Sequence, residues 1–577
     1  MRRTLLSYLS TLLALVMSTA HAEDVLIKTR DGITLSATLA LPNPRPEGRI
    51  PTVLEFTIYS EPEKLKAAAE ELAARGYAGI VADARGKRLS PDAPAPYETE
   101  AKDTHAVLDW IVKQPWSDGK VGMIGGSYTG FTAWAATKRK HPALKGIAVS
   151  AAAIPGQGLP MQNNVFLSAN YQWAFYVANN KLLDDTLNDA GQRWWKMQRE
   201  WFLSGRPYRQ IDAVDGTPNP WLQRWLKHPA YDKYWQSMVP YENDFAHIDI
   251  PVLTITGYYD DAQVSALQYM KQHLAHGRNP EHYLIIGPYD HFGASARNKS
   301  EVLRDYTIDP VAQIDSQELK LQFMDYVLKG QPKPALLVNN INYEVMGANV
   351  WRHAPSLGSV HGGVPMRLYF SSQKSEGVLS LANRQPPSDS LVTHEVDLAD
   401  RVKFHNFHYY PAPIVQGPLS YVTESIFISE PFEAPTVISG AFTGDLTVVI
   451  NKKDFDLGVT VYEAMPDRKL FHLGYAIHRA SYGEDPGKRR LLSPGKLEHV
   501  KFETPMVSRQ MQPGSRLLVL VDAIKNPSAQ VNYGTGKDVS DESIKDAGDP
   551  LKIEIRSGSY FEVPLDNSFS TKPVNPQ

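Results

Sequence analysis

Apolar and polar positions repeat with two different periods along this chain, and the change of period divides it into regions. Between residues 24 and 153, short apolar runs of strand type alternate with stretches of helical composition. The runs lie at 53–58, 77–82, 120–124 and 144–150, and the helical stretches lie at 63–75, 101–112 and 131–137. This alternation predicts a mostly parallel sheet with helices on both faces, which binds its ligands at the carboxyl ends of the strands.

The alternation stops after residue 153 and resumes after residue 247. Residues 154–247 are mostly helical in composition and carry seven of the eleven tryptophans: Trp173, Trp194, Trp195, Trp201, Trp221, Trp225 and Trp235. We interpret this segment as a helical cap inserted over the active site. Each of these rings either lines an acyl pocket or packs in the core of the cap, and the second role is the commoner one for aromatic side chains. The sheet resumes with strands at 251–257 and 283–288 and helices at 266–276 and 316–328.

Beyond a proline-containing linker at 329–334, the pattern changes to a period of two residues. Short alternating runs recur at 366–370, 446–450, 458–462 and 516–521. They are separated by glycine, proline, asparagine and aspartate, which indicates a β-sandwich, and a jelly roll is the form that we expect.

The first 22 residues have the order of regions found in secretory signal peptides. Arg2 and Arg3 form a positive start, residues 5–16 are mostly apolar, and Ala20-His21-Ala22 forms a small-x-small cleavage site. The apolar stretch is too short for a comfortable membrane span. We therefore predict a periplasmic or secreted protein whose mature chain begins at Glu23; the alternative is a retained N-terminal anchor.

Charge and composition exclude several classes of partner and site. The 577 residues include 60 basic and 63 acidic side chains, for a net charge of −3, which favours neither nucleic acid nor an anionic membrane as a partner. The chain has no cysteine, so disulfides and cysteine metal sites are excluded. The length predicts about three to four domains. A homo-oligomer stays open at this stage.

Candidate chemistry centres on Ser127, where an apolar run passes through two glycines into a helical stretch. The surrounding sequence is Gly125-Gly126-Ser127-Tyr128-Thr129-Gly130. Such a strand-to-helix turn exposes a serine hydroxyl at a helix N-terminus, where backbone N–H groups stabilise an oxyanion. Gly125 and Gly130 let the strand and the helix approach closely. Taken alone, the pattern equally fits a glycine-rich start of an ordinary helix.

A serine nucleophile needs a base, and the base needs a carboxylate that orients it. The first strand after the cap ends near Asp260, and the next one ends near His291. Both residues follow Ser127 in the order serine, acid, histidine, each at the carboxyl end of a strand. We therefore predict a catalytic triad of Ser127, His291 and Asp260. Asp261 is the rival acid, and Asp260 is preferred because it is the first carboxylate past the strand.

Several motifs occur together along the chain. They are Asp83-Ala84-Arg85-Gly86, Gly125-Gly126-Ser127-Tyr128-Thr129-Gly130, Gly257-Tyr258-Tyr259-Asp260, Gly287-Pro288-Tyr289-Asp290-His291 and Tyr343-Glu344-Val345-Met346-Gly347. The combination resembles the α/β-hydrolase family of cocaine esterase, α-amino acid ester hydrolase and the Xaa-Pro dipeptidyl peptidases, from about residue 24 to the C-terminus. The resemblance implies an α/β-hydrolase domain at 23–153 and 248–330, a helical cap at 154–247, and a C-terminal jelly roll at 335–577.

The resemblance also implies two donors to the oxyanion. One is the backbone N–H of Tyr128, and the other is the hydroxyl of Tyr59. The sequence departs from the family pattern at Ile58, where proline is common, and at Tyr258 and Tyr289, where tryptophan is frequent. These changes reshape the pocket and leave the chemistry intact. The implied mechanism needs no metal and no organic cofactor.

We expect a serine hydrolase that acts through an acyl-enzyme on a small ester or on a short peptide or amide. The first hypothesis is an esterase or α-amino acid ester hydrolase, with β-lactam-type amides within its range. The alternative is an Xaa-Pro-type dipeptidyl peptidase, which commonly carries a large N-terminal domain, whereas only about 30 residues separate the signal from the first core strand here. A third hypothesis, a binding protein without catalysis, conflicts with the complete triad. No membrane contact is expected after signal removal.

Overall fold

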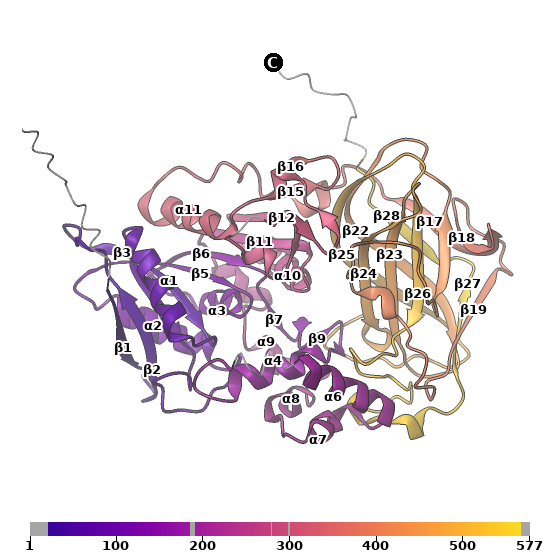
Figure 1. The fold of residues 1–577 in the computed structure, drawn as a ribbon, viewed down its shortest axis with the longest axis horizontal. Coiled ribbons are helices and arrows are strands. Elements are labelled where there is room, and N and C mark those ends of the chain that lie inside the picture. The colour runs from indigo at the N-terminus through magenta and orange to yellow at the C-terminus, as the bar shows by residue number, and fades with distance from the viewer. Residues whose placement is uncertain (1–20, 185–190, 279, 298–299, 567–577) are drawn as a thin grey trace, which may run out of the picture.

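The computed structural model of the chain describes residues 21–184, 191–278, 280–297 and 300–566. Within these residues, the N-terminal part forms a ten-stranded sheet (Figure 1). In spatial order the strands are β1 (Ala22–Lys28), β2 (Thr34–Ala40), β4 (Ala78–Asp83), β3 (Ile50–Thr57), β5 (Ser117–Gly126), β6 (Leu144–Ser150), β11 (Val252–Tyr259), β12 (His282–Asp290), β15 (Ile341–Val345) and β16 (Val350–Ala354). The strands from β4 to β15 run parallel, and the pairs at the two edges are antiparallel, which confirms the predicted sheet type.

Helices cover both faces of this sheet, as the alternation of strands and helices predicted. The first face carries α1 (Pro62–Ala74) and α11 (Ser316–Lys329), and the second carries α2 (Glu100–Ile111), α3 (Tyr128–Thr137) and α10 (Gln263–His276). Successive strand residues such as Val53 and Leu54 therefore belong to different core clusters. None of the helices that the structure describes is both long enough and apolar enough to cross a bilayer.

Helix α11 shows how local sequence sets the limits of an element. The Asp315 carboxylate accepts a hydrogen bond from the N–H of Glu318 at 2.8 Å and so caps the first turn. Gly330 ends the helix with a φ of 68°, a left-handed conformation that glycine adopts without a steric cost.

The cap lies between β6 and β11, and helices predominate in it. They are α4 (Ala169–Ala178), α6 (Gly191–Ser204), α7 (Ile211–Asp215), α8 (Pro220–Trp225) and α9 (Lys233–Gln236). Its first part is not helical, in contrast to the prediction for residues 154–247. It forms the short strands β7 (Ile154–Pro155), β8 (Gly158–Leu159), β9 (Met161–Gln162) and β10 (Val165–Phe166). Two prolines and two glycines with positive φ lie within 155–160, and both residue types disfavour a helix interior.

The C-terminal part is a largely antiparallel β-domain, as the period-two pattern predicted. Its strands are β17 (Met366–Ser375), β18 (Val378–Ala382), β19 (Leu391–Val396), β20 (Val415–Gln416), β21 (Ser425–Ser429), β22 (Thr436–Ile450), β23 (Asp456–Ala464), β24 (Leu470–Arg479), β25 (Leu497–Met511), β26 (Arg516–Ala523), β27 (Leu551–Arg556) and β28 (Tyr560–Val563). Exposed and buried residues alternate strictly along β19. In Figure 1 this domain lies to the right, the first sheet to the left, and the cap helices below them.

The border between the two sheets lies later in the chain than the sequence suggested. We placed the start of the jelly roll at residue 335, but β15 pairs in parallel with β12, and β16 pairs with β15. Every residue of β15 is buried, as in other interior strands of a parallel sheet. Hydrogen bonding therefore moves the border to the segment between Ala354 and Met366.

Candidate active site

Ser127 lies at a sharp turn between β5 and α3. Its backbone has a φ of 58° and a ψ of −119°, a conformation that non-glycine residues rarely adopt unless the surrounding structure holds it. A Cβ on Gly125 would come within 2.4 Å of the Thr129 backbone, and a Cβ on Gly130 within 2.9 Å of Ala152. Both positions therefore need glycine, and the turn presents the Ser127 hydroxyl at the carboxyl end of β5.

Side chains from the carboxyl ends of β5, β11 and β12 meet in one hydrogen-bonded relay. Nε2 of His291 lies 2.9 Å from Oγ of Ser127, and Nδ1 of His291 lies 3.0 Å from Oδ1 of Asp260. Because a carboxylate only accepts, Nδ1 carries the proton that His291 donates to Asp260, and Nε2 accepts from the Ser127 hydroxyl. The structure thus brings together the three residues that the sequence analysis combined.

Asp260 and Asp261 both reach this imidazole, and they differ in how firmly they are held. Oδ1 of Asp261 also lies 3.0 Å from Nδ1 of His291. The Asp260 carboxylate is buried and accepts from the Thr256 hydroxyl at 2.7 Å and from the N–H of Ala262 at 2.9 Å. The Asp261 side chain is 49% exposed. Asp260 is therefore the better fixed of the two acids.

The two carboxylates also change the protonation of the imidazole. Burial alone lowers the pKa of His291, but the hydrogen bonds and charges of Asp260 and Asp261 outweigh burial and hold that pKa well above its ordinary value. Burial raises the pKa of Asp260 despite its bond to His291. Because its pKa is raised, His291 is neutral and able to accept a proton only at higher pH.

Tyr128 and Tyr59, the two residues expected to donate to an oxyanion, contact each other through their rings. Tyr128 is the first residue of α3, so its N–H belongs to the turn whose donors lack partners within the helix. Tyr59 follows β3, and its ring meets the Tyr128 ring edge-on with centroids 6.1 Å apart. Nε1 of Trp173 donates to the Tyr59 hydroxyl at 3.1 Å, which leaves the O–H proton of Tyr59 available to another acceptor.

An aromatic cluster continues from these two tyrosines into the cap. The Tyr97 ring lies 5.3 Å from the Tyr128 ring and stacks on Trp173 of α4 at 5.1 Å. Trp173 in turn stacks on Trp225 at 6.3 Å. The cap therefore supplies an aromatic wall next to the candidate oxyanion donors.

Most of the other cap tryptophans pack in the core, which is the commoner role for such rings. Four of the seven are buried in the core of the protein: Trp194, Trp201, Trp225 and Trp235. Trp195 is half exposed. Trp173 donates its hydrogen bond to Tyr59, and no feature of the local sequence marks that bond.

Support beneath the nucleophile comes from residues that the sequence analysis did not single out. The N–H of Ser127 donates to the carbonyl of Ser150 at 2.9 Å, and the Ser150 and Ser295 hydroxyl oxygens lie 2.8 Å apart. The buried amine of Lys320 donates to Oγ of Ser150 at 3.2 Å, and burial lowers the pKa of Lys320 to about 8. These residues come from separate segments, so only the tertiary structure reveals them.

Comparison with known proteins assigns both parts of the chain. Residues 31–293 match the family model of the X-Pro dipeptidyl-peptidase (S15 family), and residues 337–553 match that of the X-Pro dipeptidyl-peptidase C-terminal non-catalytic domain. Cocaine esterase from Rhodococcus sp. (strain MB1 Bresler) is 25% identical over 551 residues, which cover 91% of this chain and 94% of that protein.

Solved structures share the fold over nearly the whole length. An aminopeptidase from a marine sediment archaeon (Thaumarchaeota archaeon) has a TM-score of 0.77 at 19% identity, covering 94% of this chain and 96% of its own. An α-amino acid ester hydrolase has a TM-score of 0.73 at 20% identity, covering 96% of this chain and all of its own. With both family models matched and the fold shared from end to end, the chain belongs to the family of serine hydrolases that contains cocaine esterase, α-amino acid ester hydrolase and the X-Pro dipeptidyl-peptidases.

Proposed function

We propose that this protein is an exported serine esterase that cleaves carboxylic or α-amino acid esters through a triad of Ser127, His291 and Asp260. The observation that carries the proposal is the relay from Ser127 through His291 to Asp260, with distances of 2.9 and 3.0 Å. Such geometry lets a histidine take the serine proton while the hydroxyl attacks a carbonyl carbon. β-Lactam-type amides undergo the same acyl transfer and belong to the proposed range.

The first half-reaction forms an acyl-enzyme. Nε2 of His291 takes the proton of Ser127 as Oγ bonds to the acyl carbon, and Asp260 stabilises the imidazolium. The N–H of Tyr128 and the O–H of Tyr59 donate to the oxyanion of the tetrahedral intermediate. Collapse of this intermediate breaks the bond to the alcohol, which receives the proton from His291 and leaves. Water that gives its proton to the same histidine then attacks the acyl-serine and releases the acid.

The aromatic wall beside the nucleophile bears on the choice of substrate. Trp173 is partly exposed, and the buried rings of Tyr97 and Tyr128 pack against it, with the three ring centroids 5.1 to 5.8 Å apart. Ring faces bind apolar groups through the large area that they bury. We therefore expect esters with an apolar acyl or alcohol portion to be better substrates than small polar esters.

Replacing the nucleophile tests the proposal. Ser127→Ala should lower kcat by a factor on the order of 10⁶ and leave the fold intact. A fluorophosphonate probe should label Ser127 of the wild-type protein, which peptide mass spectrometry detects. Ser237→Ala, at a serine that bonds to the Tyr234 carbonyl in the cap, is the matched control and should keep full activity. If Ser127→Ala retained more than about a hundredth of wild-type kcat, the nucleophile would lie elsewhere.

An Xaa-Pro-type dipeptidyl peptidase is the second candidate, and the two matched family models favour it. A substrate panel separates the two functions: p-nitrophenyl esters, glycine and phenylglycine methyl esters, and Ala-Pro-p-nitroanilide. The highest kcat/KM on an ester supports the esterase. The highest kcat/KM on Ala-Pro-p-nitroanilide would establish the peptidase in its place.

Export is part of the same proposal. The predicted signal peptide, residues 1–22, lies outside the described residues except for its last two. Ala22 pairs with Ala40 at the start of the edge strand β1, and Glu23 pairs with Leu39. Cleavage after Ala22 therefore removes one residue of the strand and keeps the rest of its pairing. N-terminal sequencing of protein from the periplasm or the medium should begin at Glu23, and an intact Met1 on a membrane-bound form would contradict export.

A further inference from the structure

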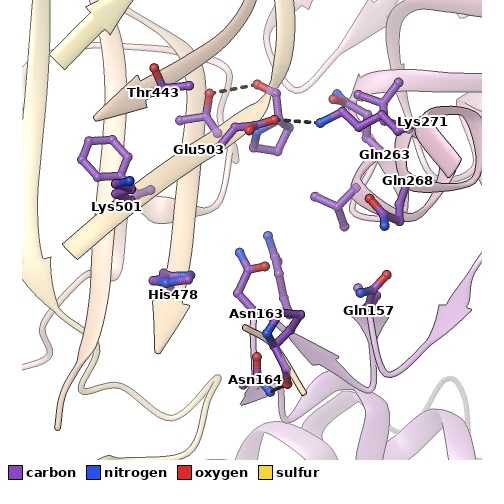
Figure 2. A pocket seen from close by; sticks show the side chains of 18 of the residues that line it. Gln157, Asn163, Asn164, Gln263, Gln268, Lys271, Thr443, His478, Lys501 and Glu503 are labelled. Atoms are coloured by element: carbon purple, nitrogen blue, oxygen red, sulfur yellow. Dashed lines mark hydrogen bonds and ion pairs between the residues drawn. The ribbon is translucent and has the colours of Figure 1, made fainter. Parts of the chain in front are cut away.

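A cavity of about 520 Å³ lies where the cap, the catalytic domain and the jelly roll meet (Figure 2). Its walls come from residues 156–164, residues 263–271 of α10, Pro486, and the jelly-roll strands β22, β24, β25 and β28. The volume falls within the range of about 300–1,000 Å³ that is typical of small-molecule sites. Its lining includes neither Ser127 nor His291, so the cavity is separate from the candidate active site.

Carboxamides dominate the polar lining of this junction cavity. They belong to Gln157, Gln162, Asn163, Asn164, Gln263 and Gln268. Each carboxamide offers two N–H donors and a carbonyl acceptor. A hydroxyl group likewise donates and accepts, so a wall of carboxamides complements a molecule that carries several hydroxyls.

Three of these carboxamides have no hydrogen-bond partner among the described residues of the protein. Within the described part of the chain, the side chains of Gln157, Gln162 and Gln268 form no hydrogen bond. Gln162 is only 4% exposed. Its carboxamide atoms keep accessible surface on the cavity, so they are available to bond to a ligand there.

Two other carboxamides of the lining, those of Asn163 and Asn164, are held in place by the protein. Asn163 and Asn164 have φ values of 45° and 66°, which persist only where tertiary contacts hold them. Nδ2 of Asn163 donates to the carbonyl of Ile477 at 2.8 Å, and Nδ2 of Asn164 donates to those of Pro229 and Pro486, each at 2.9 Å. These bonds fix both amide groups and leave their Oδ1 atoms as preset acceptors.

The lining carries two lysines, Lys271 and Lys501, against one carboxylate, so its charges disfavour a cationic ligand. Nζ of Lys271 on α10 lies 3.0 Å from Oε1 of Glu503 on β25, and this pair spans the top of the cavity in Figure 2. Burial lowers the pKa of His478, which keeps its imidazole neutral. Glu503 is the one carboxylate among the described lining residues, so a metal ion or an organic cation finds no set of acids here.

We propose that the junction cavity binds a polyhydroxylated molecule of one or two sugar rings, with Gln157, Gln162 and Gln268 as its hydrogen-bonding partners. A ligand in this position contacts all three parts of the chain. The proposal does not depend on the hydrolytic mechanism, because none of its residues belongs to the relay.

A ligand-observed NMR titration of the full mature protein with glucose, maltose, cellobiose and N-acetylglucosamine tests this proposal. At least one of these sugars should bind with a Kd below about 10 mM. The double variant Gln157→Ala/Gln268→Ala should bind that sugar at least about tenfold more weakly. Gln272→Ala lies one turn further along α10 and outside the lining, so it should keep the wild-type Kd within about twofold.

Two results would overturn the proposal. If no sugar of the panel bound below about 10 mM, the cavity would hold water alone. If a fluorophosphonate adduct on Ser127 abolished sugar binding, the sugar would occupy the active site instead. Circular dichroism checks the fold of the double variant, and the single variants Gln157→Ala and Gln268→Ala decide the outcome if that variant does not fold.

Discussion

Tyr59 receives a hydrogen bond from Trp173 and keeps its own proton, so its hydroxyl is free to donate to an oxyanion. Tyr59→Phe removes this donor and preserves the ring that packs on Tyr128. We expect kcat to fall by roughly 10²–10³, about 3–4 kcal/mol, with KM little changed, because an oxyanion donor acts mainly in the transition state. Steady-state kinetics on the best ester of the panel measures both constants.

The control for this variant lies in the same aromatic cluster. Tyr97 stacks on Trp173, so Tyr97→Phe changes a neighbouring hydroxyl and should keep kcat within about threefold. Tyr59→Phe also leaves the Trp173 N–H without its acceptor, which should cost about 1–3 kcal/mol of stability. If Tyr59→Phe lost stability and kept kcat within about threefold, Tyr59 would have a structural role only.

Asp261 affects the pH at which the histidine can act as a base. Asp261→Asn removes one of the two carboxylates that raise the pKa of His291, so that pKa should fall. Only the neutral imidazole accepts the Ser127 proton, and the acidic limb of kcat/KM should therefore move to lower pH by the same amount. The pH–rate profile of the variant measures this shift.

Asp249→Asn is the matched control, because Asp249 pairs with Lys140 on the surface and should not move the acidic limb. An acidic limb that stayed in place in Asp261→Asn would show that Asp260 alone sets the pKa of the base.

Two lysines fasten helix α4 of the cap to the loop after β4. Nζ of Lys87 donates to the carbonyls of Val177 and Asn180 at 2.7 and 2.6 Å, at the C-terminal end of α4. In return, Nζ of Lys181 donates to the carbonyl of Gly86 at 2.9 Å. The last carbonyls of a helix lack partners within the helix, and a cation there also interacts favourably with the helix dipole. This lysine clasp positions the helix that carries Trp173.

Lys87→Met tests the clasp, since it keeps an unbranched side chain and removes the donor. The freed carbonyls should cost about 1.5–3 kcal/mol of stability in urea unfolding, and kcat/KM should fall because Trp173 loses its fixed position. Lys66→Met removes a surface lysine that pairs with Glu63 and should change neither quantity. Wild-type stability in Lys87→Met would mean that the clasp does not hold the cap.

The jelly roll contacts the strand that leads to the candidate acid. The Tyr259 hydroxyl at the end of β11 donates to the carbonyl of His472 in the jelly roll at 3.1 Å. The carboxamide of Gln263 donates to the Met506 carbonyl at 3.0 Å and accepts from the Met506 N–H at 2.6 Å. These buried bonds join the two domains next to Asp260, so we expect both domains to lose structure together.

Asp522 makes the stability of the two joined domains depend on pH. Its buried carboxylate accepts from Nε2 of His394 at 2.6 Å, from Nδ1 of His405 at 3.0 Å and from the N–H of Asn406 at 2.8 Å. Burial alone raises the pKa of Asp522, but the two histidines outweigh burial and hold it well below its ordinary value. A carboxyl with a lowered folded-state pKa adds stability above its unfolded pKa of about 3.9, and that stability is lost as the pH falls further.

We therefore expect acidification below about pH 4 to remove circular dichroism signal and hydrolase activity in one transition. Asp522→Asn should be less stable than the wild type by about 3–5 kcal/mol at pH 7, and less of its stability should be lost on acidification. Asp467→Asn changes an exposed carboxylate and should follow the wild-type curve. Activity that disappeared well before the dichroism signal would argue against a shared transition.

The order of elements and the chemistry of the candidate site follow from the amino-acid sequence, because both rest on local rules. Glycines at 125 and 130 allow the strained turn at Ser127, and parallel strands place their carboxyl ends at one edge, which brings Asp260 and His291 toward Ser127. Six of the seven parallel strands and the covering helices follow from the same spacing.

Only the tertiary structure decided which residues surround that site and where the domains divide. The bond from Trp173 to Tyr59, the reach of Asp261 to His291 and the pairing of β15 with β12 all join segments whose contacts no local pattern records. Trp173 lies in a helix, as its buried neighbours do. The sequence of β15, INYEV, alternates apolar and polar residues like a strand of the jelly roll. Their roles depend on packing between residues far apart in the chain, so the sequence predicts the reaction class and the folded structure sets its environment.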